Sequence, residues 1–154
     1  MSDKEYRLEA LLSHRPPMVL LDEALDYNDE FAWARLQIKP TSLYYDSSLG
    51  GVPAWVGIEY MAQTMGIWSG SQQLKYKRPI EIGFLLGARH YQCNQPVFPS
   101  GAQLIVESKV LFHSEDGLAA FECCIRGADI NIEASARINA FMPENSAEFI
   151  RRQS

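Results

Sequence analysis

Glu59 is the residue of this sequence that most needs an explanation. It lies in residues 52–68, a largely apolar run that is interrupted by Glu59 and Gln63. Burying an unpaired carboxylate costs several kcal/mol, so we expect it to be there for a reason. A carboxyl group in such a setting is typical of a general acid or base that faces a cleft. Two structural alternatives remain open: Glu59 faces solvent, or it pairs with an arginine such as Arg35 or Arg89.

The residues just ahead could supply a second part of a site. Residues 50–54 read Gly-Gly-Val-Pro-Ala, and Pro53 suits the first turn of a helix. Gly51, Pro53 and Ala54 are therefore expected at a helix N-terminus, where free N–H groups and the helix dipole can polarise a carbonyl oxygen. Such a pocket, with a carboxylate about a turn away, suits removal of a proton next to a thioester carbonyl.

The apolar patterns predict the elements that must position these groups. Residues 54–73 are apolar on nearly every side, which is typical of a buried helix, and residues 5–12 form a short amphipathic helix. Strands are predicted at residues 18–25, 31–38, 80–93, 103–112, 118–126 and 130–141. This order fits an α+β hot-dog fold, in which a six-stranded antiparallel sheet wraps around one long central helix. We expect a single domain over residues 1–154 and at least a dimer, because a curved sheet leaves one side of the helix for a partner subunit.

The composition excludes several classes of function. The chain has 154 residues, about one domain, and its 14 Lys and Arg against 19 Asp and Glu give a net charge of -5. This balance argues against nucleic acid as a partner, because phosphate binding requires a basic surface. The N-terminus lacks an apolar run typical of a secretory signal, which favours the cytoplasm, and residues 52–68 are too short and too polar for a membrane span. We expect Cys93, Cys123 and Cys124 to be reduced thiols, with no metal-ligand spacing to a histidine.

Three blocks of the sequence carry motifs of a known enzyme family. Residues 11–22 read LLSHRPPMVLLD, residues 52–63 read VPAWVGIEYMAQ, and FLLG at residues 84–87 is followed by PVFPSG at residues 96–101. They resemble the blocks LPHRxPFLLVD, MPGxLxxEAMAQ and FL-G…PVxPGD of the 3-hydroxyacyl-(acyl-carrier-protein) dehydratases of hot-dog fold. The loop ahead of the central helix is also similar to that of the dehydratase-like proteins of bacterial aryl polyene pathways.

The resemblance implies a reaction and roles for individual residues. The reaction is dehydration of a 3-hydroxyacyl thioester on acyl carrier protein to the trans-2-enoyl product. Glu59 falls on the family's catalytic acid, and Ala54 falls on the helix-start glycine whose N–H points at the substrate carbonyl. Gln63 would orient Glu59. The resemblance implies neither a metal nor a cofactor, since the substrate is carried on phosphopantetheine.

One family residue is replaced in this sequence. The family's catalytic histidine belongs to a GHFP motif fourteen residues before the acid, where this chain has Tyr45. No histidine lies between His14 and His90. A tyrosine with an ordinary pKa near 10 is a poor base at neutral pH, although it can orient a group or donate a proton.

Three explanations of the missing histidine remain open. Glu59 could act with Tyr45 or with a histidine brought close by the fold, although His14, His90 and His113 also fit ordinary structural roles. The chain could be a degenerate dehydratase-like subunit that receives a histidine from a second hot-dog chain, because in this family histidine and acid meet across the dimer interface. It could also be an acyl thioesterase in which Glu59 activates water.

A basic cluster stands out on this acidic chain. It consists of Lys75, Lys77 and Arg78, with Arg89 as a further member. It is either a solvated loop or a docking patch for the acidic carrier protein or the phosphate of its pantetheine arm.

Overall fold

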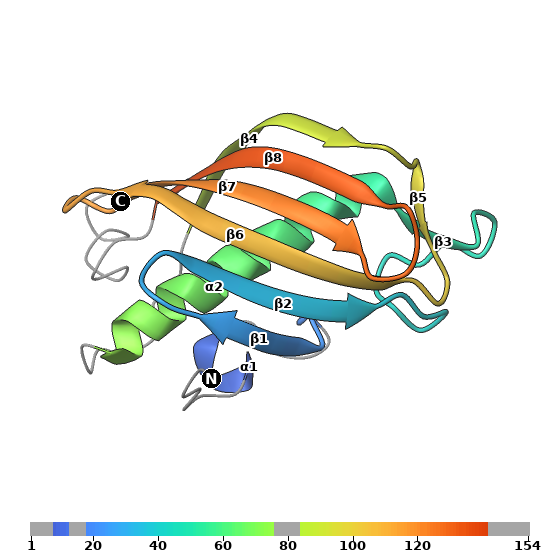
Figure 1. Cartoon of the computed structure of the whole chain (residues 1–154), viewed down its shortest axis with the longest axis horizontal. Coiled ribbons are helices and arrows are strands. Elements are labelled where there is room, and N and C mark those ends of the chain that lie inside the picture. Colours follow the sequence, from blue (N-terminus) through green and yellow to red (C-terminus); the bar gives the residue numbers. More distant parts are fainter. Residues whose placement is uncertain (1–7, 13–17, 76–83, 142–154) are drawn as a thin grey trace, which may run out of the picture.

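The computed structural model describes residues 8–12, 18–75 and 84–141. Its elements in chain order are α1 (Leu8–Leu11), β1 (Glu23–Tyr27), β2 (Phe31–Gln37), β3 (Gly51–Pro53), a 3-10 turn (Ala54–Val56), α2 (Gly57–Lys75), β4 (Phe84–Cys93), β5 (Val97–Pro99), β6 (Gln103–His113), β7 (Leu118–Gly127) and β8 (Glu133–Phe141). Figure 1 shows the long helix α2 lying against the concave side of the sheet.

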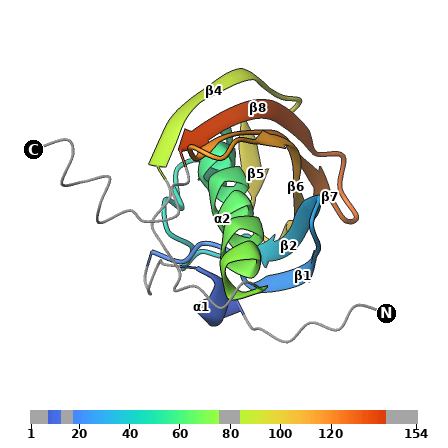
Figure 2. The same ribbon diagram turned by 90° about the vertical axis from the view of Figure 1, so that its left-hand side faces the viewer.

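Six strands form one antiparallel sheet in the order β1-β2-β6-β7-β8-β4. Viewed along α2, the strands curve around the helix (Figure 2). The prediction of an α+β hot-dog fold, with six antiparallel strands around one long helix, is confirmed.

The alternating strand patterns place small and apolar side chains against α2. In β2 the even-numbered residues from Ala32 to Leu36 are almost fully buried, while Phe31 and Trp33 face the other side of the sheet. In β7 the buried Cys123 and the half-buried Cys124 alternate in the same way, and both are free thiols. A period of two in side-chain direction explains both observations.

Several element boundaries differ from the sequence prediction. The first strand begins at Glu23 rather than at residue 18, because part of the 18–22 backbone is hydrogen-bonded to the side chain of Gln63. The last strand begins at Glu133, after a turn in which the Ile132 N–H donates to the Ile130 carbonyl. The predicted strand over 80–93 is described from Phe84 onward, and residues 80–83 lie outside the described residues.

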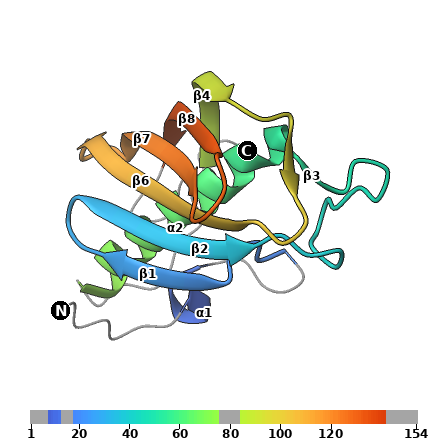
Figure 3. The ribbon, with the colours of Figure 1, turned by 45° about the vertical axis from the view of Figure 1, so that its right-hand side comes forward.

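The sequence analysis missed a second, two-stranded sheet, formed by β3 and β5. Prolines at both strand ends make these segments resemble loops. Gly51 is required here, because a Cβ atom on it would lie 2.1 Å from the carbonyl oxygen of Phe98. The chain passes from β3 directly into the helix, and the β2–β3 loop projects from this end of the molecule (Figure 3).

The helix predicted over 54–73 consists of the 3-10 turn and the 19-residue α2. Most of its sides are buried, and Gly70 packs so closely on α1 that a Cβ atom would lie 2.0 Å from the Leu11 carbonyl oxygen. The described residues leave one side of the helix open. This uncovered stripe consists of exposed and half-buried residues at helical spacing: Trp55, Ile58, Glu59, Ala62, Gly66 and Ser69.

Candidate active site

Glu59 lies on the uncovered stripe and is exposed. Within the residues that the structure describes, its carboxylate has no hydrogen bond and no ion pair. Arg35, one suggested partner, is bound instead to Glu23 of β1 at 2.8 Å. Of the alternatives left open by the sequence, the solvent-facing carboxylate is therefore the one that the single chain shows.

The loop between β2 and β3 is held in place by its own hydrogen bonds. The Tyr45 N–H donates to the Ser42 carbonyl at 3.0 Å, and the Asp46 N–H donates to the Gly51 carbonyl at 2.8 Å. Hydrogen bonds from the N–H and hydroxyl of Ser48 lower the pKa of the Asp46 carboxyl. The segment that replaces the family's histidine motif is thus a defined turn.

An aromatic pair joins this loop to the start of the helix. The rings of Tyr44 and Trp55 meet edge to face with centroids 5.7 Å apart, and Trp55 is 59% exposed. Trp55 lies in the 3-10 turn and Glu59 in the first turn of α2, and both side chains are exposed on the uncovered stripe. Tyr44 has a φ of 69°, an unfavourable conformation for a residue with a side chain. Such strain is concentrated at functional sites, which supports this end of α2 as the site.

Tyr45 itself is half-buried and packs against the core. No hydrogen bond joins it to Glu59 in the described chain. The structure therefore places Tyr45 as a packing residue of the loop that borders the site.

The Ala54 N–H has a partner within the single chain. This N–H donates to the carbonyl of Pro96 at 3.0 Å, because the β3–β5 pairing continues by one residue into the helix start. The Gly51 N–H is directed to the Asp46 carbonyl at 3.4 Å, and Pro53 has no N–H to offer. The backbone donors expected at residues 51–54 are thus used within the chain.

The side chain of Gln63 also has partners within the single chain. Its side chain is 3% exposed, and its oxygen accepts the Leu20 N–H at 2.9 Å while its NH2 group donates to the Met18 carbonyl at 2.8 Å. Both ends of the amide are occupied by backbone groups. In the single chain Gln63 therefore fixes the 18–20 segment to α2.

Tyr91 of β4 is a residue near the helix start that the sequence analysis missed. Its hydroxyl donates to the Ala54 carbonyl at 2.5 Å, and it lies so close to Gly57 that a Cβ atom there would be 2.4 Å away. Burial raises the pKa of Tyr91 well above its ordinary range, so the phenol remains neutral. No motif in the sequence marks this contact, because it joins residues 37 positions apart.

No hydrogen bond or ion pair joins Glu59 to His90 or His113, the two histidines that the structure describes. His113 meets Trp68 edge to face at 5.5 Å, more than two helical turns beyond Glu59. His90 has a φ of 58° and lies where the β4–β8 register shifts, next to Tyr91. His14 lies outside the described residues.

The predicted basic cluster is not gathered into one patch by the described residues. Lys75, the last residue of α2, forms an ion pair of 2.8 Å with Asp29 in the β1–β2 turn. Arg89 lies on β4, at the opposite edge of the sheet, across from Arg137. Lys77 and Arg78 lie outside the described residues.

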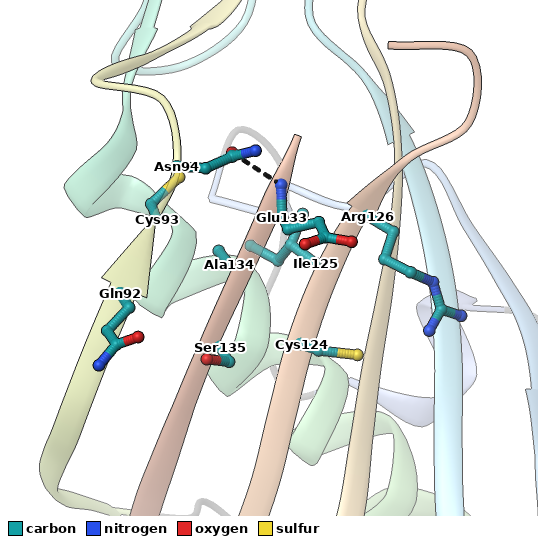
Figure 4. Close-up of a pocket in the computed structure, with 9 residues that line it drawn as sticks. All are labelled: Gln92, Cys93, Asn94, Cys124, Ile125, Arg126, Glu133, Ala134 and Ser135. Carbon is teal, nitrogen blue, oxygen red and sulfur yellow. Dashed lines mark hydrogen bonds between the residues drawn. The ribbon is translucent and has the colours of Figure 1, made fainter. Parts of the chain in front are cut away.

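A separate pocket of about 490 Å³ lies over β4, β7 and β8 on the side of the sheet away from α2 (Figure 4). Cys93 and Cys124 contribute to its lining, as does Asn94, whose side-chain oxygen accepts the Glu133 N–H at 2.9 Å. Glu59 and the β2–β3 loop do not contribute to it.

Among the described residues, no group of three His, Cys, Asp or Glu side chains is arranged to hold a metal ion. No described helix is long and apolar enough to cross a membrane.

Comparison with known proteins identifies the family. The sequence model of the ApeP-like family, described as ApeP dehydratase, matches residues 6–151. This chain belongs to the ApeP-like dehydratase family. The match confirms the predicted resemblance to hot-dog dehydratases of the aryl polyene type. No curated protein matches the sequence significantly.

Three solved structures similar to this ApeP-like protein differ in identity, coverage and TM-score. The dehydratase heterocomplex ApeI:P from Xenorhabdus doucetiae matches with a TM-score of 0.87 and 27% identity, covering 98% of this chain and 99% of that chain. The PaaI protein of E. coli matches with a TM-score of 0.59 and 12% identity, covering 77% and 80% of the two chains. A hypothetical thioesterase from Streptococcus pneumoniae matches with a TM-score of 0.57 and 13% identity, covering 78% and 84%. The PaaI and thioesterase matches show a shared fold alone.

Proposed function

We propose that this ApeP-like chain contributes Glu59 to a dehydratase site that a second hot-dog chain completes. The observation that carries the proposal is the placement of Glu59 on the uncovered stripe, exposed and without a partner in the described chain. The similar structure from Xenorhabdus doucetiae is a dehydratase heterocomplex, which supports a partner of the same fold.

The free edge of the sheet suits such a partner. β4 is an edge strand with β8 on one side only, so its other edge is unpaired within the described chain. Leu85 and Leu86 on this strand are 46% and 58% exposed. A free strand edge next to exposed apolar side chains favours pairing with another chain. The same contact would cover the stripe and exclude water from Glu59.

The reaction is elimination of water from a 3-hydroxyacyl thioester carried by acyl carrier protein. A histidine of the second chain removes the proton from C2, the C2–C3 double bond forms, and the C3–O bond breaks. Glu59 gives a proton to the leaving hydroxyl, which departs as water. The acyl group arrives on a phosphopantetheine arm, and neither a metal nor a further cofactor takes part. Tyr45 fills the space of the family's histidine without replacing it as a base.

The test compares this chain alone with its complex, using a 3-hydroxyacyl carrier protein and mass spectrometry for the loss of water. We expect the complex to dehydrate the substrate and Glu59→Gln in the complex to be at least about 100-fold slower, the usual contribution of a positioned acid. Glu115→Gln, which changes an exposed carboxylate in the β6–β7 turn, serves as the matched control. A Glu59→Gln complex that works at the wild-type rate would refute the role of Glu59. Release of free thiol in place of water loss would indicate a thioesterase.

A further inference from the structure

Tyr60, the residue after Glu59, has a hydroxyl that the fold leaves without a partner. Its side chain is 1% exposed, and within the described part of the chain its hydroxyl makes no hydrogen bond. Neighbouring buried polar groups are all paired: Thr64 donates to the Tyr60 carbonyl at 2.8 Å and Ser108 donates to the Met61 carbonyl at 3.1 Å. A buried hydroxyl without a partner is unusual and costly, so it requires an explanation.

A pocket beside the Tyr60 hydroxyl offers an explanation for the missing partner. The Tyr60 pocket, of about 210 Å³, is formed by residues 19–22, the end of β2, the loop 39–43 and Tyr60. The pKa of Tyr60 is raised by burial and then by the negative charge of Asp22, which also lines the pocket. The hydroxyl is therefore neutral, can donate a hydrogen bond, and lies at the end of the side chain near Asp22.

The pocket is built from separate segments that are fixed before any ligand binds. Asp22 accepts the Gln37 N–H through Oδ2 at 2.8 Å, which joins the N-terminal segment to β2. The Lys39 N–H donates to the Ser42 hydroxyl oxygen at 2.9 Å, which closes the loop. The hydrogen bonds of Gln63 to Met18 and Leu20 hold the third wall. A preformed pocket avoids the entropic cost of ordering on binding.

The polar groups of the Tyr60 pocket define what it can bind. Tyr60 offers a donor, while Asp22 Oδ1 is an acceptor with no hydrogen bond in the described chain. Lys39 has no ion pair within the described residues. Val19, Leu20 and Leu36 make the remaining walls apolar. A simple anion would be repelled by Asp22, and a simple cation would be repelled by Lys39.

A neutral amide matches both polar groups of the pocket. Its carbonyl oxygen can accept a hydrogen bond from Tyr60, and its N–H can donate one to Asp22. We propose that the Tyr60 pocket binds an amide of a phosphopantetheine arm, with Lys39 at its rim facing the phosphate. The volume of about 210 Å³ equals about 7 waters at the density of the liquid, so the pocket holds a section of the arm rather than all of it.

The position of the pocket agrees with this assignment. Tyr60, which lines the pocket, is the residue after Glu59. Ser42, which also lines it, accepts a hydrogen bond from the Tyr45 N–H through its carbonyl. The inference rests on the proposed function for the choice of ligand, since a carrier-bound substrate brings this arm.

The test measures binding without turnover, by NMR titration of the protein with pantetheine, phosphopantetheine and inorganic phosphate. Tyr60→Phe is expected to weaken pantetheine binding about tenfold, or ~1.4 kcal/mol. Lys39→Gln is expected to weaken phosphopantetheine several-fold and to leave pantetheine unchanged. Lys109→Gln, an exposed lysine of β6, is the control. Apo and holo carrier proteins, compared in the same way, separate arm binding from contacts to the carrier itself.

A stability measurement keeps the result interpretable. Tyr60→Phe removes an unpartnered hydroxyl, so its unfolding midpoint should equal or exceed that of the wild type. Equal pantetheine affinity of wild type and Tyr60→Phe, or binding of inorganic phosphate alone, would overturn the assignment. Glu59→Gln should bind the arm normally, so a failure of the catalytic proposal and a failure of the Tyr60 pocket give different results.

Discussion

Replacing Gln63 by leucine tests whether this residue serves stability or catalysis. The substitution keeps a similar volume but removes the acceptor of the Leu20 N–H and the donor to the Met18 carbonyl. Each buried group left without a partner costs about 1–3 kcal/mol. Because Met18 is 50% exposed, water reaches part of this segment, and we expect a total loss of about 2–3 kcal/mol.

A loss of this size is a large fraction of the ordinary stability of a domain. In a chain of this length it lowers the melting temperature by roughly 5–10 °C. Urea unfolding measures the change through the midpoint, with an unchanged slope showing that the two-state transition is preserved. Gln72→Leu is the matched control, since its amide makes a hydrogen bond to Asp29 of 3.2 Å at the surface. We expect it to cost about 0.5 kcal/mol or less.

Dehydration by the complex, measured well below the melting temperature, separates the two roles. If Gln63 holds the 18–20 segment, the folded Gln63→Leu complex retains most of its rate. If the midpoint is unchanged and the rate falls as far as in Glu59→Gln, Gln63 orients the acid and the structural reasoning is refuted.

Three further predictions follow from packing, burial and backbone strain. Gly70→Ala should destabilise the protein by about 1–3 kcal/mol in urea unfolding, because its Cβ atom would lie 2.0 Å from the Leu11 carbonyl oxygen. Gly66→Ala is its control: the new Cβ atom would meet only the end of a leucine side chain, so its stability should equal or exceed that of the wild type. Burial raises the pKa of the Cys123 thiol to about 12, so the folded state holds this proton as the unfolded state loses it. The free energy of unfolding of the wild type should therefore fall above pH 9. Its difference from that of Cys123→Ala should shrink there by about 1.4 kcal/mol per pH unit. A difference that stays constant between pH 8 and pH 10 would contradict this. His90→Gly should raise the melting temperature by a few degrees, because the backbone there has a φ of 58°, and a lower melting temperature would show that the imidazole packs favourably.

The sequence predicts the architecture because hydrophobic periodicity is a local property. The run around Glu59 is apolar on nearly every side, and only a buried central helix satisfies it. The alternation of residues 31–38 likewise predicts a strand, and the structure has one over Phe31–Gln37. The motif around Glu59 indicates the dehydratase family, which the family match then shows.

The tertiary structure decided where the polar groups of the site are directed. The Ala54 N–H finds the Pro96 carbonyl, and the amide of Gln63 finds the backbone at Met18 and Leu20. These partners lie more than 40 residues apart in the chain, and no local pattern encodes such a pairing. The sequence by itself determined that a carboxylate lies in an apolar helix of a hot-dog fold. Only the folded chain shows that this carboxylate is exposed on the one stripe that the sheet leaves open, because coverage depends on how far the sheet extends around the helix.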